Sequence, residues 1–212
     1  ASQTEYNGTF VISVTDSTHI SYEVTGTPAT PATGTISIKG GRTTVPGVVY
    51  LDGYFFVMYT NGVIYNSGLN DPLSWGALDF ITAAIEPGAG IAVTKSQNYI
   101  IAFKEWSTEF FYNAGNSPGS PLSPVLSAFS LIGCASGDSV ASLDETVYWA
   151  AKARQRGPGI YRMKGTQQEK VSGPDVDRVL ASDGMSSVYS YGVKIAGHSF
   201  YVLGLKTLGI TL

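Results

Sequence analysis

The chain has 212 residues and a formal net charge of −3, with 43% hydrophobic and only 14% charged residues. This composition excludes an intrinsically disordered chain, because disorder goes with low hydrophobicity and high charge. The 13 Lys and Arg residues are scattered, so we expect no tight binding of duplex DNA, which needs many basic contacts to phosphates. The 13 Tyr and 25 Gly residues favour strands joined by turns, and an all-β fold is predicted.

Residues 1–38 are predicted to form a small antiparallel β module. The segments GTFVISVTD (8–16) and HISYEVTG (19–26) alternate apolar and polar residues, as strands with one solvent-facing side do. Residues 16–18 supply a turn between them, and TISIK (35–39) is a third short strand. Because two or three strands alone bury too little surface to be stable, we expect this module to accompany a larger body.

A weak internal repeat predicts the organisation of residues 39–212. A polar or Gly pair followed by an apolar run recurs at Asp52, Gln97, Asp144 and Gly197, with separations of 45, 47 and 53 residues. This is the size of a four-stranded propeller blade, whose faces must be covered by neighbouring blades. A propeller-like stack of antiparallel blades is therefore predicted. The alternative, a β-sandwich, does not require the same motif to return at such intervals.

Three or four blades do not close a ring, since propellers have four to eight. We therefore expect either an incomplete stretch of a longer protein or a partial propeller completed by another chain. Two segments have helical features. Residues 71–90 are predicted to be an irregular connector with at most one helical turn, whereas Pro174 is placed to open a true helix. Its apolar side is predicted to consist of Val176, Val179 and Leu180.

The segment Gly115-Asn116-Ser117-Pro118-Gly119 matches the G-x-S-x-G pattern that carries the nucleophile of many serine hydrolases. In that elbow the residue after the serine donates its backbone N–H to the oxyanion. Here that residue is Pro118, which has no N–H. The match is therefore interpreted as accidental, and no catalytic residue is predicted.

The sequence also shows no cluster of metal ligands and no cofactor-binding motif. The two histidines and the one cysteine are far apart in sequence, and neither a phosphate-binding loop nor a dinucleotide-binding motif is present. Asp175 and Asp177 are better explained as carboxylates at a helix start than as metal ligands. Cys134 is expected to be a small buried residue and not a reactive thiol. No apolar run approaches the length of a membrane-spanning helix.

Arg154 and Arg156 flank a predicted hairpin tip between two strands. They are either a solvated tip that resists edge pairing or a contact with carboxylates of a neighbouring subunit, for which the planar guanidinium is suited. Trp75 and Trp106 complete the candidate interface, because aromatic residues are favoured between subunits.

Several weak motifs occur in a fixed order over residues 40 to about 205. They are Trp75 with Asp79-Phe80, the strand Glu109-Phe110-Phe111-Tyr112, the pair Gly133-Cys134, and the strand containing Gly159, Tyr161, Arg162 and Gly165. Together they resemble the tail-hub proteins, or nozzles, of short-tailed bacteriophages, which are described as packaged-DNA stabilisation proteins. The N-terminal segment resembles a β module that recurs as an insertion in phage virion proteins.

This resemblance implies a structural role without enzymatic activity or a cofactor. Such hubs are propeller-like subunits in a sixfold ring beneath the portal and its adaptor ring. They extend the DNA channel, help to retain packaged DNA, and support the tail needle and fibres. The implied location is the virion tail after synthesis in the host cytoplasm, with DNA passing through the channel without tight binding and no membrane contact.

Two other hypotheses remain open from the residues. The chain is alternatively a carbohydrate- or receptor-binding module of a phage fibre, in which Trp106 and Trp149 stack on sugar rings. A glycan-cleaving enzyme that uses Asp144 or Glu109 ranks last.

Overall fold

The computed structural model describes residues 1–8, 10, 12–14, 19–35 and 43–212, which fall into two compact units, Ala1–Gly41 and Arg42–Leu212. The first unit contains a short 3₁₀ helix, η1 (Thr4–Tyr6), and an antiparallel pair of strands, β1 (Ile12–Val14) and β2 (Ile20–Tyr22). The two predicted strands at 8–16 and 19–26 are thus confirmed in their described residues. The predicted turn at 16–18 and nearly all of the predicted strand at 35–39 lie outside the described residues.

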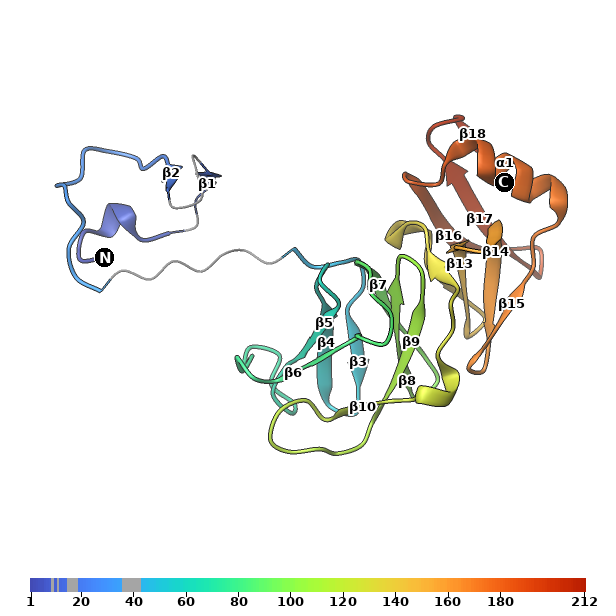
Figure 1. The fold of residues 1–212 in the computed structure, drawn as a ribbon, viewed down its shortest axis with the longest axis horizontal. Coiled ribbons are helices and arrows are strands. Elements are labelled where there is room, and N and C mark those ends of the chain that lie inside the picture. The colour runs from blue at the N-terminus through green and yellow to red at the C-terminus, as the bar shows by residue number, and fades with distance from the viewer. Residues whose placement is uncertain (9, 11, 15–18, 36–42) are drawn as a thin grey trace. The chain divides into compact units, whose positions relative to one another are not determined.

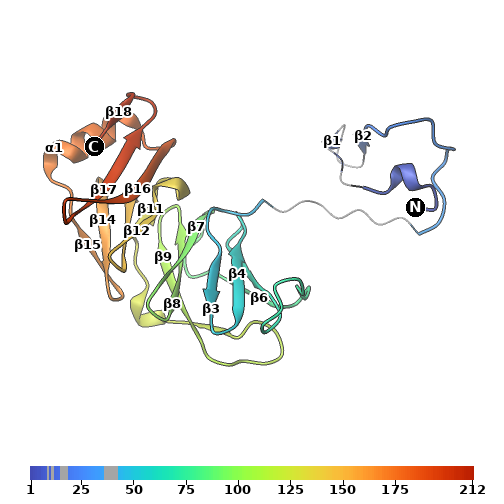
Figure 2. The same cartoon turned by 180° about the vertical axis from the view of Figure 1, so that it is seen from behind.

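The second unit consists of four antiparallel sheets that follow one another in chain order (Figures 1 and 2). We number these sheets as blades. The first blade contains β3 (Val49–Leu51), β4 (Tyr54–Met58), β5 (Val63–Asn66) and β6 (Phe80–Thr82). The second contains β7 (Gly90–Ser96), β8 (Tyr99–Lys104), β9 (Thr108–Asn113) and β10 (Leu122–Pro124).

The third blade contains β11 (Gly133–Cys134), β12 (Ala141–Leu143), β13 (Thr146–Ala153), β14 (Arg156–Lys164) and β15 (Gln167–Lys170). The fourth contains β16 (Val188–Ile195), β17 (His198–Leu205) and β18 (Ile210–Thr211). Two 3₁₀ helices, η2 (Leu126–Ala128) and η3 (Gly137–Ser139), lie between β10 and β12 in the chain, and α1 (Pro174–Asp183) connects the third blade to the fourth.

The repeated polar or Gly pairs are two-residue turns at equivalent places in the blades. The turns are Asp52-Gly53, Gln97-Asn98, Asp144-Glu145 and Ala196-Gly197, and each leads into the second strand of a hairpin. The fourth turn begins one residue before the start predicted at Gly197. The first residue of each turn has a positive φ of 49–52°, the left-handed conformation that tight hairpin turns require. The predicted repeat is therefore confirmed, and its physical basis is the hairpin turn.

Three apolar cores join consecutive blades. On β8, Ile100 and Ala102 belong to the core shared with the first blade, whereas Ile101 and Phe103 belong to the core shared with the third. Successive side chains of a strand point to opposite faces, so this alternation covers the second blade on both sides. In the third blade Trp149 packs toward the second blade, and its neighbour Ala150 packs toward the fourth.

This arrangement confirms an all-β fold of stacked blades. A β-sandwich is excluded, because the second and third blades each have two neighbouring sheets.

Helix α1 is confirmed where the sequence predicts it. It begins at Pro174 and ends before Gly184, whose φ of 76° terminates it. The apolar side lies in the third core, where Leu180 is buried and Val176 and Val179 pack beside it. In contrast, the connector predicted at 71–90 contains β6, a strand that the sequence analysis missed.

Candidate interface site

A groove of about 470 Å³ lies at one edge of the second and third blades. It is lined by the segment before β7, the turn between β8 and β9, residues 130–132, and the turn between β13 and β14. Three of the four predicted interface residues, Trp106, Arg154 and Arg156, line it. We refer to it as the Trp106 groove.

Trp106 is held in the groove by backbone packing beneath it and by cations beside it. Its turn lies directly against Gly133 of β11, where a Cβ atom would come within 2.3 Å of the Glu105 carbonyl oxygen. Only glycine permits this approach, which explains the Gly133 of the Gly133-Cys134 motif. The side-chain cations of Lys152 and Arg154 each lie 5.8 Å from the centre of the Trp106 ring, within the range of cation–π attraction.

Arg154 and Arg156 have different environments, although the predicted hairpin tip between β13 and β14 is confirmed. Arg154 pairs with Glu86 at 2.8 Å, so it ties the third blade to the segment that joins the first and second blades. Arg156 is exposed at the start of β14, and none of the ion pairs among the described residues includes it. The guanidinium of Arg154 is therefore engaged within its own chain, whereas that of Arg156 is exposed.

Trp75 lies apart from the groove, between β5 and β6 of the first blade. Its indole Nε1 donates a hydrogen bond of 2.8 Å to the carbonyl of Pro72, and 41% of the residue is exposed. Glu86, in contrast, lines the groove but was not singled out from the sequence. An acidic residue before Pro87 carries no sequence signal for pairing with a cation some 70 positions away.

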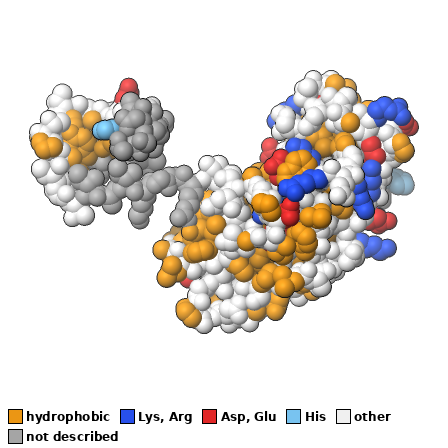
Figure 3. Space-filling view, in the orientation of Figure 1, with side chains coloured by type: hydrophobic (Ala, Val, Ile, Leu, Met, Phe, Trp, Pro, Cys, Tyr) orange, Lys and Arg blue, Asp and Glu red, His pale blue; other side chains and the backbone are white. Residues whose placement is uncertain are grey.

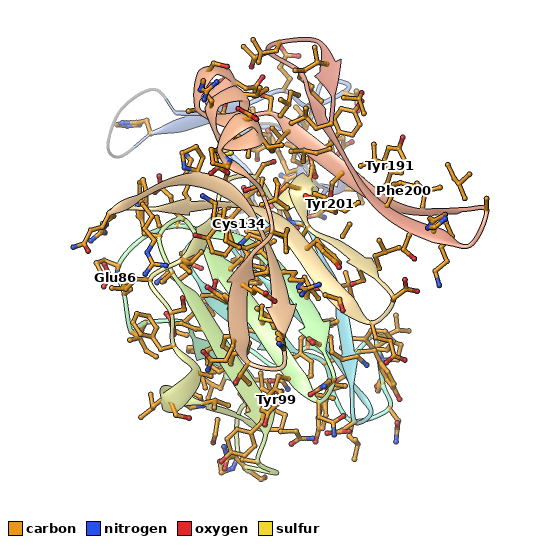
Figure 4. All side chains as sticks on the ribbon, turned by 90° about the vertical axis from the view of Figure 1, so that its right-hand side faces the viewer. Glu86, Tyr99, Cys134, Tyr191, Phe200 and Tyr201 are labelled. Carbon is orange, nitrogen blue, oxygen red and sulfur yellow. The ribbon has the colours of Figure 1, made fainter. Side chains whose placement is uncertain are left out.

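A buried ion pair anchors the segment that carries Glu86. Lys104 and Glu109 are nearly inaccessible to solvent, and Nζ lies 3.9 Å from Oε1. The Lys104 ammonium also donates hydrogen bonds to the carbonyls of Ala83 (2.8 Å) and Glu86, and Glu109 accepts one of 3.2 Å from the backbone N–H of Ile85. Burial raises the pKa of Glu109, and the positive charge of Lys104 opposes this rise. Glu86 is labelled in Figure 4.

Among the described residues, neither Ser117 nor Cys134 is placed as an activated nucleophile. Ser117 lies in the exposed loop between antiparallel strands β9 and β10 and not in a strand-to-helix turn, which confirms that the G-x-S-x-G match is accidental. Cys134 is buried as expected, and burial raises the pKa of its thiol to about 12. The thiol is therefore neutral near pH 7 and is a poor nucleophile.

The carboxylates considered for metal or glycan chemistry have structural partners. Asp177 accepts hydrogen bonds from Lys170 (2.6 Å) and Ser172 (2.5 Å) at the start of α1. Burial opposes ionisation of Asp177, but these two donors outweigh it and lower its pKa. Exposed Asp144 pairs with Lys194 and accepts a hydrogen bond from Ser199, and the hydrogen bond from Lys194 is the main cause that lowers its pKa. In the described part of the chain, no group of three or more His, Cys, Asp or Glu residues is placed to hold a metal ion.

The hypothesis that Trp149 stacks on a sugar ring is wrong. Its side chain is completely buried between the second and third blades, and its ring centroid lies 4.9 Å from that of Phe103. Glu109 is also buried, so it is not accessible to a polysaccharide. Among the described residues, no helix is both long and apolar enough to cross a membrane.

Comparison with known proteins identifies the family of the chain. The family model described as bacteriophage P22 Gp10, beta-propeller, matches residues 4–210. No curated protein matches the chain at a significant level. The matched region includes all four blades, whose stacking agrees with the propeller architecture of the family. The chain therefore belongs to the bacteriophage P22 Gp10 beta-propeller family, a family of phage structural proteins that stabilise packaged DNA.

Proposed function

We propose that this chain is a structural part of a phage tail hub, which prolongs the DNA channel below the portal and adaptor ring and helps to retain the packaged DNA. The observation that carries this proposal is the stack of four blades joined by three continuous apolar cores. Such a scaffold is suited to bearing load through its shape. Family membership supports a role in the virion and not in catalysis. The N-terminal module predicted at residues 1–38 is proposed as an accessory to the blades.

The charge distribution supports a channel that DNA passes through without being held. Many of the described cations are paired with carboxylates of the same chain, as Arg154 is with Glu86 and Arg162 with Glu169. On the face of the blade unit seen in Figure 3, basic side chains stand beside acidic and apolar ones and form no continuous strip. Tight, salt-dependent binding requires many cations facing phosphates, so we expect weak binding of duplex DNA.

Copies of the chain are proposed to assemble in a ring, sixfold as in the hubs that the sequence resembles. The ring would meet the portal and adaptor above and the tail needle or fibres below. The Trp106 groove is a suitable contact between neighbours, because it combines an aromatic ring with the exposed guanidinium of Arg156. Trp75 on the first blade offers a second exposed aromatic contact.

Replacement of Arg156 by alanine tests the groove. Because a charge-assisted hydrogen bond contributes about 1.5–3 kcal/mol, we expect Arg156→Ala to weaken assembly roughly tenfold or more. The thermal unfolding of the isolated chain should stay unchanged. Sedimentation velocity over a concentration series measures both the oligomer mass and the dissociation constant.

Arg178→Ala is the matched control, because Arg178 is an exposed arginine on α1 whose ion pair with Asp175 lies at the surface. It should leave assembly unchanged. If wild type and Arg156→Ala assembled equally, the hairpin tip would be a solvated turn without a role in assembly. A wild-type chain that stays monomeric and does not bind portal or adaptor proteins would contradict the hub proposal itself.

A further inference from the structure

A second groove, of about 430 Å³, lies at one end of the second blade, next to the β3–β4 turn of the first blade. The described residues that line it are Asp52, Asn98, Tyr99, Tyr112, Asn113 and Val125. Asn98 precedes β8 and Trp106 follows it, so this groove and the Trp106 groove lie at opposite ends of that strand. We refer to the second groove as the Tyr112 groove. Tyr99 is labelled toward the lower edge of the molecule in Figure 4.

Two tyrosines form the aromatic part of the groove. Tyr99 of β8 and Tyr112 of β9 occupy directly opposed positions, so their side chains lie on the same face of the blade. Tyr99 packs in part against the second core, whereas 42% of Tyr112 is exposed. Phe110 and Phe111, which precede Tyr112 in the same sequence motif, are buried in the cores. The cores therefore account for the phenylalanines of this motif but leave the ring of Tyr112 available to a ligand.

The polar part of the groove contains a carboxylate and two amides. The Asn113 side chain is held at both ends, because its Nδ2 donates a hydrogen bond of 3.0 Å to Oδ2 of Asp52 and its Oδ1 accepts one of 2.9 Å from the backbone N–H of Gly115. In the described part of the chain, Oδ1 of Asp52 has no hydrogen-bond or ion-pair partner, and neither has the side chain of Asn98. Asp52 and Asn113 are therefore fixed in place, and all three side chains retain hydrogen-bonding capacity.

The equivalent carboxylate of the third blade has both oxygens occupied. Asp144, like Asp52, is the first residue of a two-residue turn. It binds Lys194 through one oxygen and Ser199 through the other, and both partners belong to the next blade. At Asp52 the next blade supplies the neutral amide of Asn113 and no cation. One oxygen of Asp52 and its negative charge are therefore left for a ligand.

We propose that the Tyr112 groove binds a neutral saccharide unit. A pyranose ring has a face of C–H groups that packs on an aromatic ring, and its adjacent hydroxyls both donate and accept hydrogen bonds. Tyr112 supplies the ring, Asp52 accepts from hydroxyls, and the amides of Asn98 and Asn113 donate and accept. A volume of about 430 Å³ lies within the range of small-molecule sites, about 300–1,000 Å³.

Charge and donor content argue against other classes of ligand. A phosphate or carboxylate would face Asp52, and the described lining contains no Lys, Arg or His to attract it. A cation would use Asp52 and the tyrosine rings, but the N–H groups of the two amides would have no acceptor. A neutral ligand with several hydroxyls uses every polar group of the lining. This binding activity goes beyond the proposed scaffold role and does not depend on it.

Saturation-transfer difference NMR tests the proposal, because it detects weak complexes with small ligands. The probes are the methyl glycosides of glucose, galactose, mannose and N-acetylglucosamine. We expect signals from the ring C–H protons of at least one glycoside with the wild-type chain. Tyr112→Ala should abolish these signals, and Tyr112→Phe should retain them, since the ring face is kept. Asp52→Asn should raise the dissociation constant about tenfold or more, because a hydrogen bond to a charged acceptor is lost.

Controls separate the groove from the rest of the surface. Tyr191→Ala removes an exposed tyrosine of the fourth blade, and Glu145→Gln neutralises an exposed carboxylate at a turn. Neither should change the signals. The uronic acid form of the bound hexose should bind more weakly than the hexose, and Asp52→Asn should reduce this difference. Circular dichroism checks folding, and this charge comparison remains decisive if Tyr112→Ala does not fold.

Three outcomes would overturn the inference. The first is the absence of signals from all four glycosides, and the second is signals that persist unchanged in both Tyr112→Ala and Asp52→Asn. The third is binding of tetramethylammonium without binding of any glycoside, which would identify the groove as a site for cations. Each of these outcomes leaves the hub proposal standing, because none of the measurements depends on assembly.

Discussion

At the scale of single residues, the polar groups of the blade unit mainly hold chain segments in place. Lys104 and Glu109 illustrate this, since both bind the backbone of the segment between the first and second blades. A buried pair of this kind adds little net stability, but removal of one partner leaves the other charge uncompensated. The pair therefore fixes where Glu86, and through it Arg154, is placed at the Trp106 groove.

The buried carboxyl of Glu109 predicts a specific pH dependence. Its pKa in the folded chain is raised above the ordinary value of 4.5, so the folded chain binds this proton more tightly than the unfolded chain. The resulting stabilisation is fully present below the unfolded pKa and is lost as pH rises through the folded pKa. Because Glu109→Gln removes this titration, we expect wild type to lose stability relative to the variant as pH rises above about 4.5.

Urea unfolding of both chains at several pH values between 4 and 8 measures this difference. Glu145→Gln, at an exposed turn, is the control and should show no such trend. A difference between wild type and Glu109→Gln that is constant over this range would show that Glu109 ionises in the folded chain as it does in water.

At the scale of elements, the path of β11 past the β8–β9 turn determines the shape of the Trp106 groove. A Cβ atom at residue 133 would lie 2.3–2.5 Å from backbone atoms of Glu105 and Trp106, closer than packed atoms can approach. We therefore expect Gly133→Ala to destabilise the chain by about 1–3 kcal/mol and to shift the fluorescence of Trp106. Denaturant unfolding and tryptophan emission spectra measure the two effects.

Gly157→Ala, at the exposed start of β14, is the matched control, because a Cβ atom there meets nothing within 4 Å. The expected effect of the control is small. If Gly133→Ala were as stable as the control, the backbone contact between β11 and the turn would not be as close as described.

The elements that the sequence predicted well are those defined by local rules. The turn pairs and the alternation within β8 and β13 specify hairpins and two-sided burial without knowledge of distant residues. Strand β6 was missed because its apolar residues also fit a helical spacing, and its pairing with β5 is decided by contacts across the turn. The Lys104–Glu109 pair was missed because the two residues meet only once the β8–β9 hairpin has formed.

At the scale of the whole molecule, we propose that the chain acts as a structural scaffold. The apolar cores between blades make the stack a continuous scaffold, and the Trp106 groove lies at the edge of the second and third blades. The four predicted interface residues did not form one site. Three of them meet at the Trp106 groove, whereas Trp75 lies elsewhere on the first blade, because sequence alone does not place the loops of different blades.

The central claim is that these blades stack face to face around an axis and that several copies of the chain assemble with one another. Single-particle electron microscopy of the purified chain tests it most directly, because projections show the arrangement of subunits around an axis. The account predicts ring-shaped particles with a central opening, built from several copies. Compact particles of a single copy without an opening, at every concentration examined and also in the presence of portal and adaptor proteins, would contradict it.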